Sequence, residues 1–192
     1  MYQNIVVKDG VLWIDGVHMH RFHNASPQQN ASLMIDQANV KRGDAVLDLC
    51  TGLGYTALTA AKRGAIVTTI EGSPAVLELL AKHNSVLLEH ANVKIIQDDA
   101  FHAVAQLPDA SFNAIIHDPP RFSMAGELYS QAFYDELFRL LAARGRLFHY
   151  TGKPGLKSGK NIVSGIKKRL MNAGFQKITW VESCQGYKAV KP

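Results

Sequence analysis

The stretch Val46-Leu-Asp-Leu-Cys-Thr-Gly-Leu-Gly54 decides how the chain folds, because a short apolar run is followed at once by two closely spaced glycines. Asp48 stands near the end of the apolar run, and Thr51-Gly52-Leu53-Gly54 turns the chain towards a helix that begins near Tyr55. Glycines let the backbone turn tightly and approach a ligand closely, where a side chain would clash. The stretch therefore predicts a strand, a turn and a helix that together present a ligand site.

The pattern of this stretch repeats along the chain. Short apolar runs rich in branched residues alternate with amphipathic stretches, which predicts βαβ units and a parallel sheet buried on both faces. After Gly174-Phe175 two further runs flank residues 183–186 and predict a terminal antiparallel hairpin. The expected strands are 45–49, 66–70, 93–96, 114–116, 146–148, 178–181 and 187–190, and the expected helices lie near 55–63, 74–90, 100–106 and 129–142.

The first residues of the chain form a separate unit. Apolar runs at 5–7 and 11–14 flank Asp9-Gly10, a two-residue hairpin signal, and Asp15-Gly16 offers a second turn. A polar stretch follows, and a helix is expected over roughly 28–39. We therefore divide the chain into an N-terminal β-hairpin and substrate-side segment, 1–27, and a ligand-binding domain, 28–192.

Composition narrows the class of protein. With 192 residues, 47% hydrophobic and 19% charged, the chain has the composition of a soluble globular protein. It shows no transmembrane run and no signal peptide, and its two cysteines suggest neither a disulfide framework nor a metal cluster. We expect a cytoplasmic protein that uses no membrane and no metal.

Charge is unevenly distributed along the chain. Residues 1–150 hold 12 Lys or Arg against 15 Asp or Glu, whereas 151–192 hold nine basic residues and one acid, Glu182. Such a basic segment favours an anionic partner such as RNA. The alternative is a solvated lysine face, because Lys167 and Lys168 lie beside Ile166 in a helical pattern.

Acidic residues follow the first three expected strands of the parallel sheet. After Asp48 come Glu71, which suits the two hydroxyls of a ribose, and Asp98-Asp99, which suits the amine of an adenine ring. The segment from Gly52 also satisfies the G-x-G-x-x-G/A dinucleotide fingerprint. Asp48 would repel a pyrophosphate but suits a cationic methionine group. The additional acids Asp98-Asp99 and the terminal hairpin are two further differences from a dinucleotide-binding protein. S-adenosylmethionine is therefore the favoured ligand over a nicotinamide cofactor.

Two motifs carry a family resemblance. Residues 46–55 resemble the first motif of class I methyltransferases, and Ile115-Ile-His-Asp-Pro-Pro-Arg-Phe-Ser resembles the fourth. With residues 125–130 and 147–152, they resemble a family of predicted archaeal methyltransferases of unassigned substrate. The resemblance implies a Rossmann-like α/β fold with a seven-stranded, mostly parallel sheet, and S-adenosylmethionine as cofactor. The residues expected to bind it are Asp48, Cys50, Thr51, Gly52, Gly54, Tyr55, Glu71, Gly72, Asp98, Asp99, Ala100 and Asp118.

Asp118-Pro119-Pro120 follows the fourth parallel strand and is the expected catalytic segment, together with Phe122. An amine could hydrogen-bond to the Asp118 carboxylate and the Pro119 carbonyl, so that positioning supplies much of the catalysis. Methyltransferases that act on base amino groups have an aromatic residue directly after the prolines, whereas Arg121 stands there in this chain. The motif is also similar to that of RNA methyltransferases acting on pyrimidine carbon 5, but the cysteine nucleophile which that chemistry requires is missing after the fifth strand.

Candidate substrate contacts lie outside the cofactor motif. They are His20, Arg21, His23, Gln29, Arg121 and His149, and a hydrogen-bonded structural role is the alternative for His149. The resulting hypothesis is methyl transfer to nitrogen or oxygen of an RNA base or a small molecule. The alternatives are an aminopropyltransferase-like enzyme and a non-catalytic cofactor-binding scaffold subunit. A homodimer is a further expectation.

Overall fold

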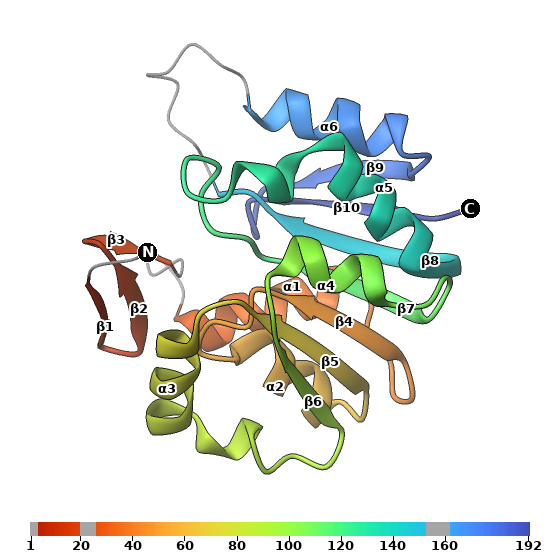
Figure 1. The fold of residues 1–192 in the computed structure, drawn as a ribbon. Helices are drawn as coiled ribbons and strands as arrows, with labels where there is room; N and C mark the ends of the chain where they lie inside the picture. Colours follow the sequence, from red (N-terminus) through yellow and green to blue (C-terminus); the bar gives the residue numbers. More distant parts are fainter. Residues whose placement is uncertain (1–3, 20–25, 153–161) are drawn as a thin grey trace.

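The computed structural model describes residues 4–19, 26–152 and 162–192, and within them it contains two sheets (Figure 1). The larger sheet has seven strands in the order β6-β5-β4-β7-β8-β10-β9. The first five of these pair in parallel, and β10 runs antiparallel to both β8 and β9. Its strands are β4 (Ala45–Leu49), β5 (Ile66–Glu71), β6 (Val93–Gln97), β7 (Phe112–His117), β8 (Leu141–Tyr150), β9 (Gln176–Val181) and β10 (Gly186–Val190).

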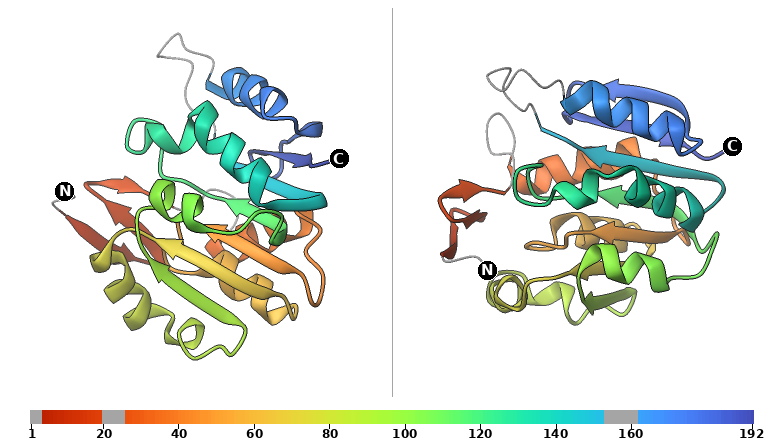
Figure 2. Two further views of the ribbon diagram at one scale, coloured as in Figure 1. Left: turned by 45° about the vertical axis from the view of Figure 1, so that its right-hand side comes forward. Right: turned by 45° about the horizontal axis from the view of Figure 1, so that its top comes forward.

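Helices cover both faces of this sheet, as two further views show (Figure 2). The helices are α1 (Pro27–Gln37), α2 (Tyr55–Lys62), α3 (Pro74–His83), α4 (Ala100–Gln106), α5 (Gln131–Leu140) and α6 (Ile162–Asn172). Successive strand residues point to opposite faces. Leu47 and Ile115 therefore join a core with α4, α5 and α6, whereas Val46 and Ile116 join a second core with α1 and α2. The predicted Rossmann-like architecture with its antiparallel C-terminal hairpin is confirmed.

The N-terminal residues form a separate three-stranded sheet of β1 (Ile5–Lys8), β2 (Val11–Ile14) and β3 (Val17–His18). Asp9 and Gly10 both have positive φ, as the predicted two-residue turn requires. Leu12 and Ile14 pack with Val76 of α3 and with Leu53 of the glycine turn. The small sheet therefore lies against the carboxyl end of the large one. The division of the chain at residue 27 remains a prediction.

Two helices differ from the expected ranges, each because a polar residue caps or ends it. The helix expected over 74–90 ends at His83, and Asn84 uses its side chain to donate to the Leu53 carbonyl at 2.9 Å; a 3₁₀ turn, Ser85–Leu87, follows. The helix expected over 129–142 begins only at Gln131, because the Ser130 hydroxyl accepts from the Phe133 N–H at 3.1 Å. The 3₁₀ turn Gly126–Tyr129 precedes it. Strand β8 is longer than expected and begins at Leu141.

Candidate active site

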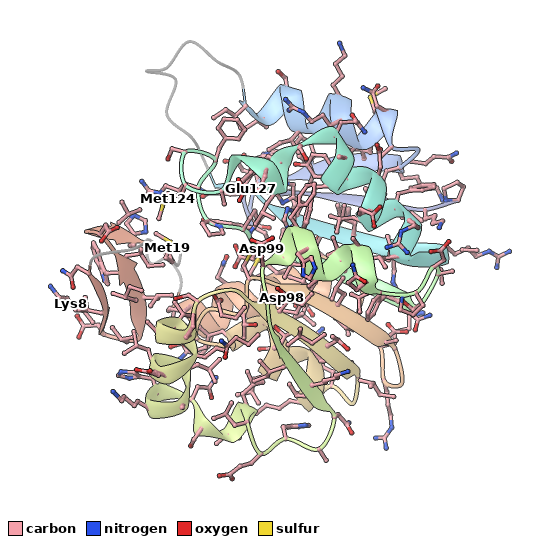
Figure 3. The ribbon with its side chains drawn as sticks, viewed as in Figure 1. Lys8, Met19, Asp98, Asp99, Met124 and Glu127 are labelled. Carbon is pink, nitrogen blue, oxygen red and sulfur yellow. The ribbon has the colours of Figure 1, made fainter. Side chains whose placement is uncertain are left out.

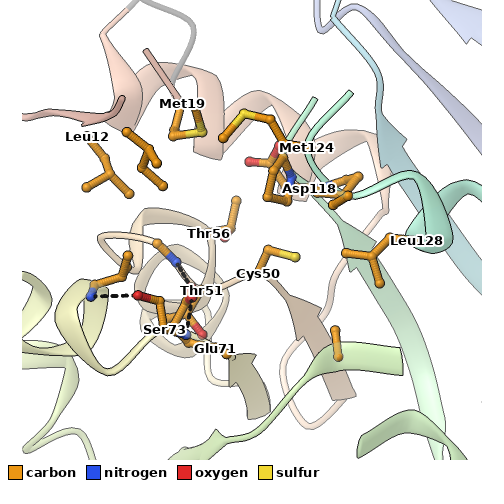
Figure 4. A pocket seen from close by; sticks show the side chains of 18 of the residues that line it. Leu12, Met19, Cys50, Thr51, Thr56, Glu71, Ser73, Asp118, Met124 and Leu128 are labelled. Carbon is orange, nitrogen blue, oxygen red and sulfur yellow. Dashed lines mark hydrogen bonds between the residues drawn. The ribbon is translucent and has the colours of Figure 1, made fainter. Parts of the chain in front are cut away.

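A cavity of about 750 Å³ opens where the parallel strands end, between the large sheet and the N-terminal sheet. Open α/β sheets bind ligands at this edge, and the volume falls within the range of small-molecule sites. Figure 4 shows Glu71 and Ser73 on one side of it, Met19 and Met124 on the opposite side, and Cys50 and Asp118 between them. The predicted site residues that line it are Cys50, Thr51, Gly52, Tyr55, Glu71, Gly72, Asp99, Ala100, Asp118, Pro119 and Pro120.

The glycine turn has the strained backbone that its sequence predicts. Cys50, Gly52 and Gly54 all have positive φ, at 68°, 55° and 76°. A Cβ on Gly54 would also collide with the Leu87 side chain, so this position needs glycine for two separate reasons. The turn leads directly into α2, whose first residue is Tyr55. Backbone N–H groups at this helix end are therefore presented to the cavity.

Glu71 is held in place by the turn. Its two carboxylate oxygens accept from the N–H groups of Gly52 and Ser73, each at 3.0 Å. Burial raises the pKa of Glu71, and the backbone hydrogen bonds oppose that rise. Each carboxylate oxygen keeps a lone pair that a ribose hydroxyl could use. The residue thus has the position and the acceptors that were predicted for it.

Asp48 lies behind the cavity wall. It is 1% exposed, and one carboxylate oxygen accepts from the Thr69 hydroxyl at 2.6 Å. The Thr69 hydroxyl lies in turn 2.6 Å from that of Thr51, which does line the cavity. Burial raises the pKa of Asp48 to about 6. Asp48 is therefore not part of the lining but is connected to it through the Thr69 and Thr51 hydroxyls, and its role in cofactor binding stays a prediction.

The acidic pair after β6 divides into two roles. Asp99 caps α4 by accepting from the His102 N–H at 3.0 Å, and it lines the cavity. Asp98 lies outside the lining, with a carboxylate oxygen 2.7 Å from Nδ1 of His102, and this hydrogen bond lowers its pKa. Figure 3 labels both residues at the start of α4. Asp99 is thus the residue of the pair that lines the cavity, and its binding of an adenine amine stays a prediction.

Asp118 directly follows β7 and lines the cavity, and no hydrogen bond to its carboxylate is found among the described residues. Burial, together with the nearby charge of Asp48, raises its pKa to about 7. The Pro120 carbonyl accepts from the Tyr129 hydroxyl at 2.8 Å, which fixes the segment from its far side. A partly protonated carboxyl with unused acceptors suits the binding and deprotonation of an N–H group.

Four further candidates among the described residues are not part of the cavity lining. Phe122 is 41% exposed and packs edge-on against Tyr129. Arg121 donates to Nε2 of His18 at 3.2 Å. Gln29 completes the cap of α1, since its side chain accepts from the Ser26 N–H at 2.8 Å. Gly54 acts through its backbone, while His20, Arg21 and His23 lie outside the described residues.

His149 lies in a buried aromatic cluster under the site. It stacks on His117 with ring centroids 4.4 Å apart, and both rings are 0% exposed. Nδ1 of His149 donates to the His117 carbonyl at 3.2 Å, and Nε2 accepts from the Tyr134 hydroxyl at 3.0 Å. Burial lowers the pKa of His149 to about 4, so the ring is neutral near pH 7. The structure favours the hydrogen-bonded structural role for this residue.

The surroundings of Cys50 determine how reactive its thiol is. Cys50 lines the cavity, but burial and four surrounding carboxylates hold the pKa of its thiol well above the usual range. Because the thiolate is the nucleophile, this environment opposes attack by Cys50. The described residues contain no group of three or more His, Cys, Asp or Glu side chains that could hold a metal ion, and no helix among them could cross a membrane.

Several lining residues are not part of the predicted set. Asn30 and Met34 come from the buried face of α1, and Met124, Glu127 and Leu128 come from the loop and 3₁₀ turn before α5. A helix pattern shows which residues are buried but does not show whether they meet a core or a cavity. The small sheet contributes Ile5, Leu12 and Ile14, whose sequence pattern reads only as strand.

Comparison with known proteins gives a consistent result. Residues 46–145 match the family described as methyltransferase domain. An uncharacterised protein of Methanocaldococcus jannaschii is 48% identical over 182 residues, which is 93% of this chain and 63% of that protein. The chain thus spans less than two thirds of the length of this relative.

Solved structures share the fold at low identity. A spermidine synthase from Thermotoga maritima is 17% identical with a TM-score of 0.70, over 95% of this chain and 65% of that one. A SAM-dependent methyltransferase from Aquifex aeolicus is 17% identical with a TM-score of 0.63, over 83% of this chain and 87% of that one.

Proposed function

Since the chain belongs to the methyltransferase-domain family and has S-adenosylmethionine as its cofactor, we propose that it transfers the methyl group to a nitrogen or oxygen atom held at Asp118. The observation that carries the proposal is that one cavity is lined at one side by Gly52, Glu71 and Asp99 and at another by Asp118-Pro119-Pro120. The donor and the acceptor would thus meet in a single cavity.

Each part of the lining has a distinct task in this proposal. When bound, the cofactor supplies a methyl group on a positively charged sulfur. Glu71 would accept from the ribose hydroxyls and Asp99 from the adenine amine, while the turn at Gly52 lets the backbone come close. Asp118 and the Pro119 carbonyl would orient the acceptor so that its lone pair faces the methyl group. Holding the two reacting atoms in this orientation would accelerate the transfer.

Calorimetry with S-adenosylhomocysteine tests the donor half. We expect micromolar binding that Glu71→Ala weakens, with Asp98→Ala as the matched control, because Asp98 is bonded to His102 outside the lining. Transfer of label from S-adenosylmethionine to fractionated cell extract then tests catalysis. Asp118→Ala should retain S-adenosylhomocysteine binding and lose transfer. Unchanged transfer in that variant would refute the positioning role, and binding without transfer in the wild type would favour a scaffold subunit.

Aminopropyl transfer is the second candidate, because the structural similarity to spermidine synthase covers 95% of this chain. Against it stand Pro119-Pro120, at the place where polyamine synthases usually carry an aspartate-rich loop. Competition between S-adenosylmethionine and its decarboxylated form separates the two candidates: a clear preference for the decarboxylated donor would select aminopropyl transfer.

RNA and small molecules are the two acceptor classes that we expect, and both stay predictions. Lys167 and Lys168 are exposed on α6, while Ile166 and Leu170 of that helix are buried, which is the pattern of an ordinary packed helix.

We also propose a cytoplasmic location, which suits two cysteines that are not joined in a disulfide. A homodimer stays a prediction, and light scattering would test it.

A further inference from the structure

The acceptor side of the cavity has its own set of walls. We call it the acceptor chamber and define it by Asn30, Met34, Asp118, Met124 and Leu128. Asn30 and Met34 lie on α1, which contacts β8 and shares a core with Ile116 of β7. Asp118 directly follows β7. Figure 4 shows Asp118, Met124 and Leu128 on the side away from Ser73 and Glu71. The donor-binding residues and the chamber are therefore separate parts of one cavity.

Two oxygen-bearing side chains of the chamber lack hydrogen-bond donors. The Asn30 side chain is in a residue only 5% exposed, and its carbonyl oxygen has no partner among the described residues. Its amide nitrogen is 4.0 Å from the Met34 sulfur, which is a weak contact. A buried polar atom left unpaired costs about 1–3 kcal/mol, so such an atom calls for an explanation. The Asn30 carbonyl oxygen and the Asp118 carboxylate therefore favour a ligand that donates hydrogen bonds.

The charge of the lining points the same way. Five carboxylates face the cavity, from Glu71, Glu78, Asp99, Asp118 and Glu127, and the described part of the lining holds no Lys, Arg or His side chain. A cleft of one charge sign concentrates the opposite ion and repels ions of its own sign. Glu71 and Asp99 belong to the donor side, as does Glu78 of α3, the helix that follows Glu71. The charges of Asp118 and Glu127 remain for the acceptor, and they favour a cation over a phosphate-bearing molecule.

The rest of the chamber is apolar. Met34 is 2% exposed and Leu128 is 5% exposed, and Met124 approaches from the loop after Pro120. Methionine side chains adapt to irregular shapes because they are unbranched and flexible. A ligand that suits these walls carries a hydrocarbon or aromatic body next to its charged group.

We propose that the methyl acceptor is a small amine, protonated in water, whose nitrogen is bound by Asp118 and Asn30 and whose carbon skeleton packs against Met34, Met124 and Leu128. This inference rests on the proposed function, since it names the acceptor for the same site. It selects the nitrogen nucleophile over oxygen and the small molecule over RNA.

The proposed reaction needs only the amine, the methyl donor and the Asp118 carboxylate. The ammonium group first gives one proton to the Asp118 carboxylate, and the freed nitrogen lone pair forms the bond to the methyl carbon. The sulfur–methyl bond breaks, and its electron pair stays on sulfur, which becomes a neutral thioether. The product is a protonated methylamine, and the proton on Asp118 passes to solvent. The pKa of about 7 for Asp118 suits this proton transfer.

Three ligands of equal length test the proposal: n-hexylamine, 1-hexanol and n-hexanoate, each titrated into the full chain saturated with S-adenosylhomocysteine. We expect the amine to bind at least about ten-fold more tightly than the carboxylate, with the alcohol between them. Asn30→Leu should weaken amine binding by up to about ten-fold, whereas Asn30→Asp should preserve or strengthen it, because it keeps an oxygen acceptor. The affinity for S-adenosylhomocysteine should stay constant in both variants, which shows that they fold.

The outcomes separate this inference from the proposed function. Equal or tighter binding of hexanoate would overturn the amine assignment. So would a loss of amine binding in Asn30→Asp that matches the loss in Asn30→Leu. Preferential binding of a single-stranded RNA oligonucleotide over hexylamine would overturn the choice of a small molecule. If S-adenosylhomocysteine itself failed to bind the wild-type chain, the proposed function would fall.

Discussion

Replacing Asp118 by asparagine should stabilise the protein while it abolishes methyl transfer. The pKa of this carboxyl rises from 3.8 to about 7 on folding, chiefly through burial. Each pKa unit corresponds to about 1.4 kcal/mol, so ionised Asp118 destabilises the folded state by about 4 kcal/mol at pH 8. An asparagine side chain has nearly the same shape and does not ionise. We therefore expect Asp118→Asn to gain up to about 4 kcal/mol at that pH.

The sign follows from where the proton is held. Between pH 3.8 and about 7 the folded protein keeps a proton on Asp118 that the unfolded chain releases. Stability from this group therefore falls as pH rises through that window and is constant above it. At pH 5 the gain from Asp118→Asn should be only about 2 kcal/mol.

Urea unfolding at pH 5 and pH 8 measures both values, with the free energy of unfolding extrapolated to zero denaturant. Glu89→Gln is the matched control, because Glu89 is exposed and has no ion-pair partner among the described residues; it should change little at either pH. A gain that is equal at both pH values, or a loss at pH 8, would refute the account of a carboxyl strained by burial.

Two further predictions concern the turn and the buried histidines. Gly54→Ala should cost about 2–4 kcal/mol in urea unfolding and weaken S-adenosylhomocysteine binding, since it adds a clash with Leu87 to a positive φ. Gly43→Ala, at φ +82° in open space, should cost only about 1–2 kcal/mol, and equal losses would contradict the role of the clash. His149 acts in the opposite direction to Asp118: its folded pKa of about 4 lies below the ordinary 6.5, so its stability contribution is lost as pH falls through that window. When the pH is lowered from 7 to 5, the free energy of unfolding of His149→Gln should therefore fall by about 2 kcal/mol less than that of the wild type. An equal fall in the two proteins would argue against a buried neutral ring.

Much of the fold was predictable because its signals are local. Apolar runs of the right length predict the strands from Ala45 onward, and Asp9-Gly10 predicts the first hairpin. The errors arose where a side chain overrides periodicity. Asn84 ends α3 by bonding to Leu53, which is 31 residues away in sequence, and no window of neighbouring residues contains that contact.

The candidate site was predictable on its donor side and much less so on its acceptor side. Glu71 and Asp99 stand at strand ends, where a sequence pattern points directly to a ligand. Asp48 has the same pattern, yet its side chain turns to Thr69 behind the wall. Asn30 and Met124 come from a helix face and a loop, and only the assembled structure shows that they meet one cavity. Long-range packing, which leaves no local signal, accounts for that difference.

The separation of the N-terminal sheet from the large one has a consequence for how such an enzyme could diversify. Ile5, Leu12 and Ile14 line the cavity from a sheet that shares no strand pairing, among the described residues, with the strands carrying Glu71 and Asp118. Because Leu12 and Ile14 also pack on Leu53 of the glycine turn and on Val76 of α3, substitutions in the small sheet act on the shape of the cavity and on the donor side at the same time. A change of ligand preference that arises in the small sheet is therefore expected to need compensating changes at the glycine turn.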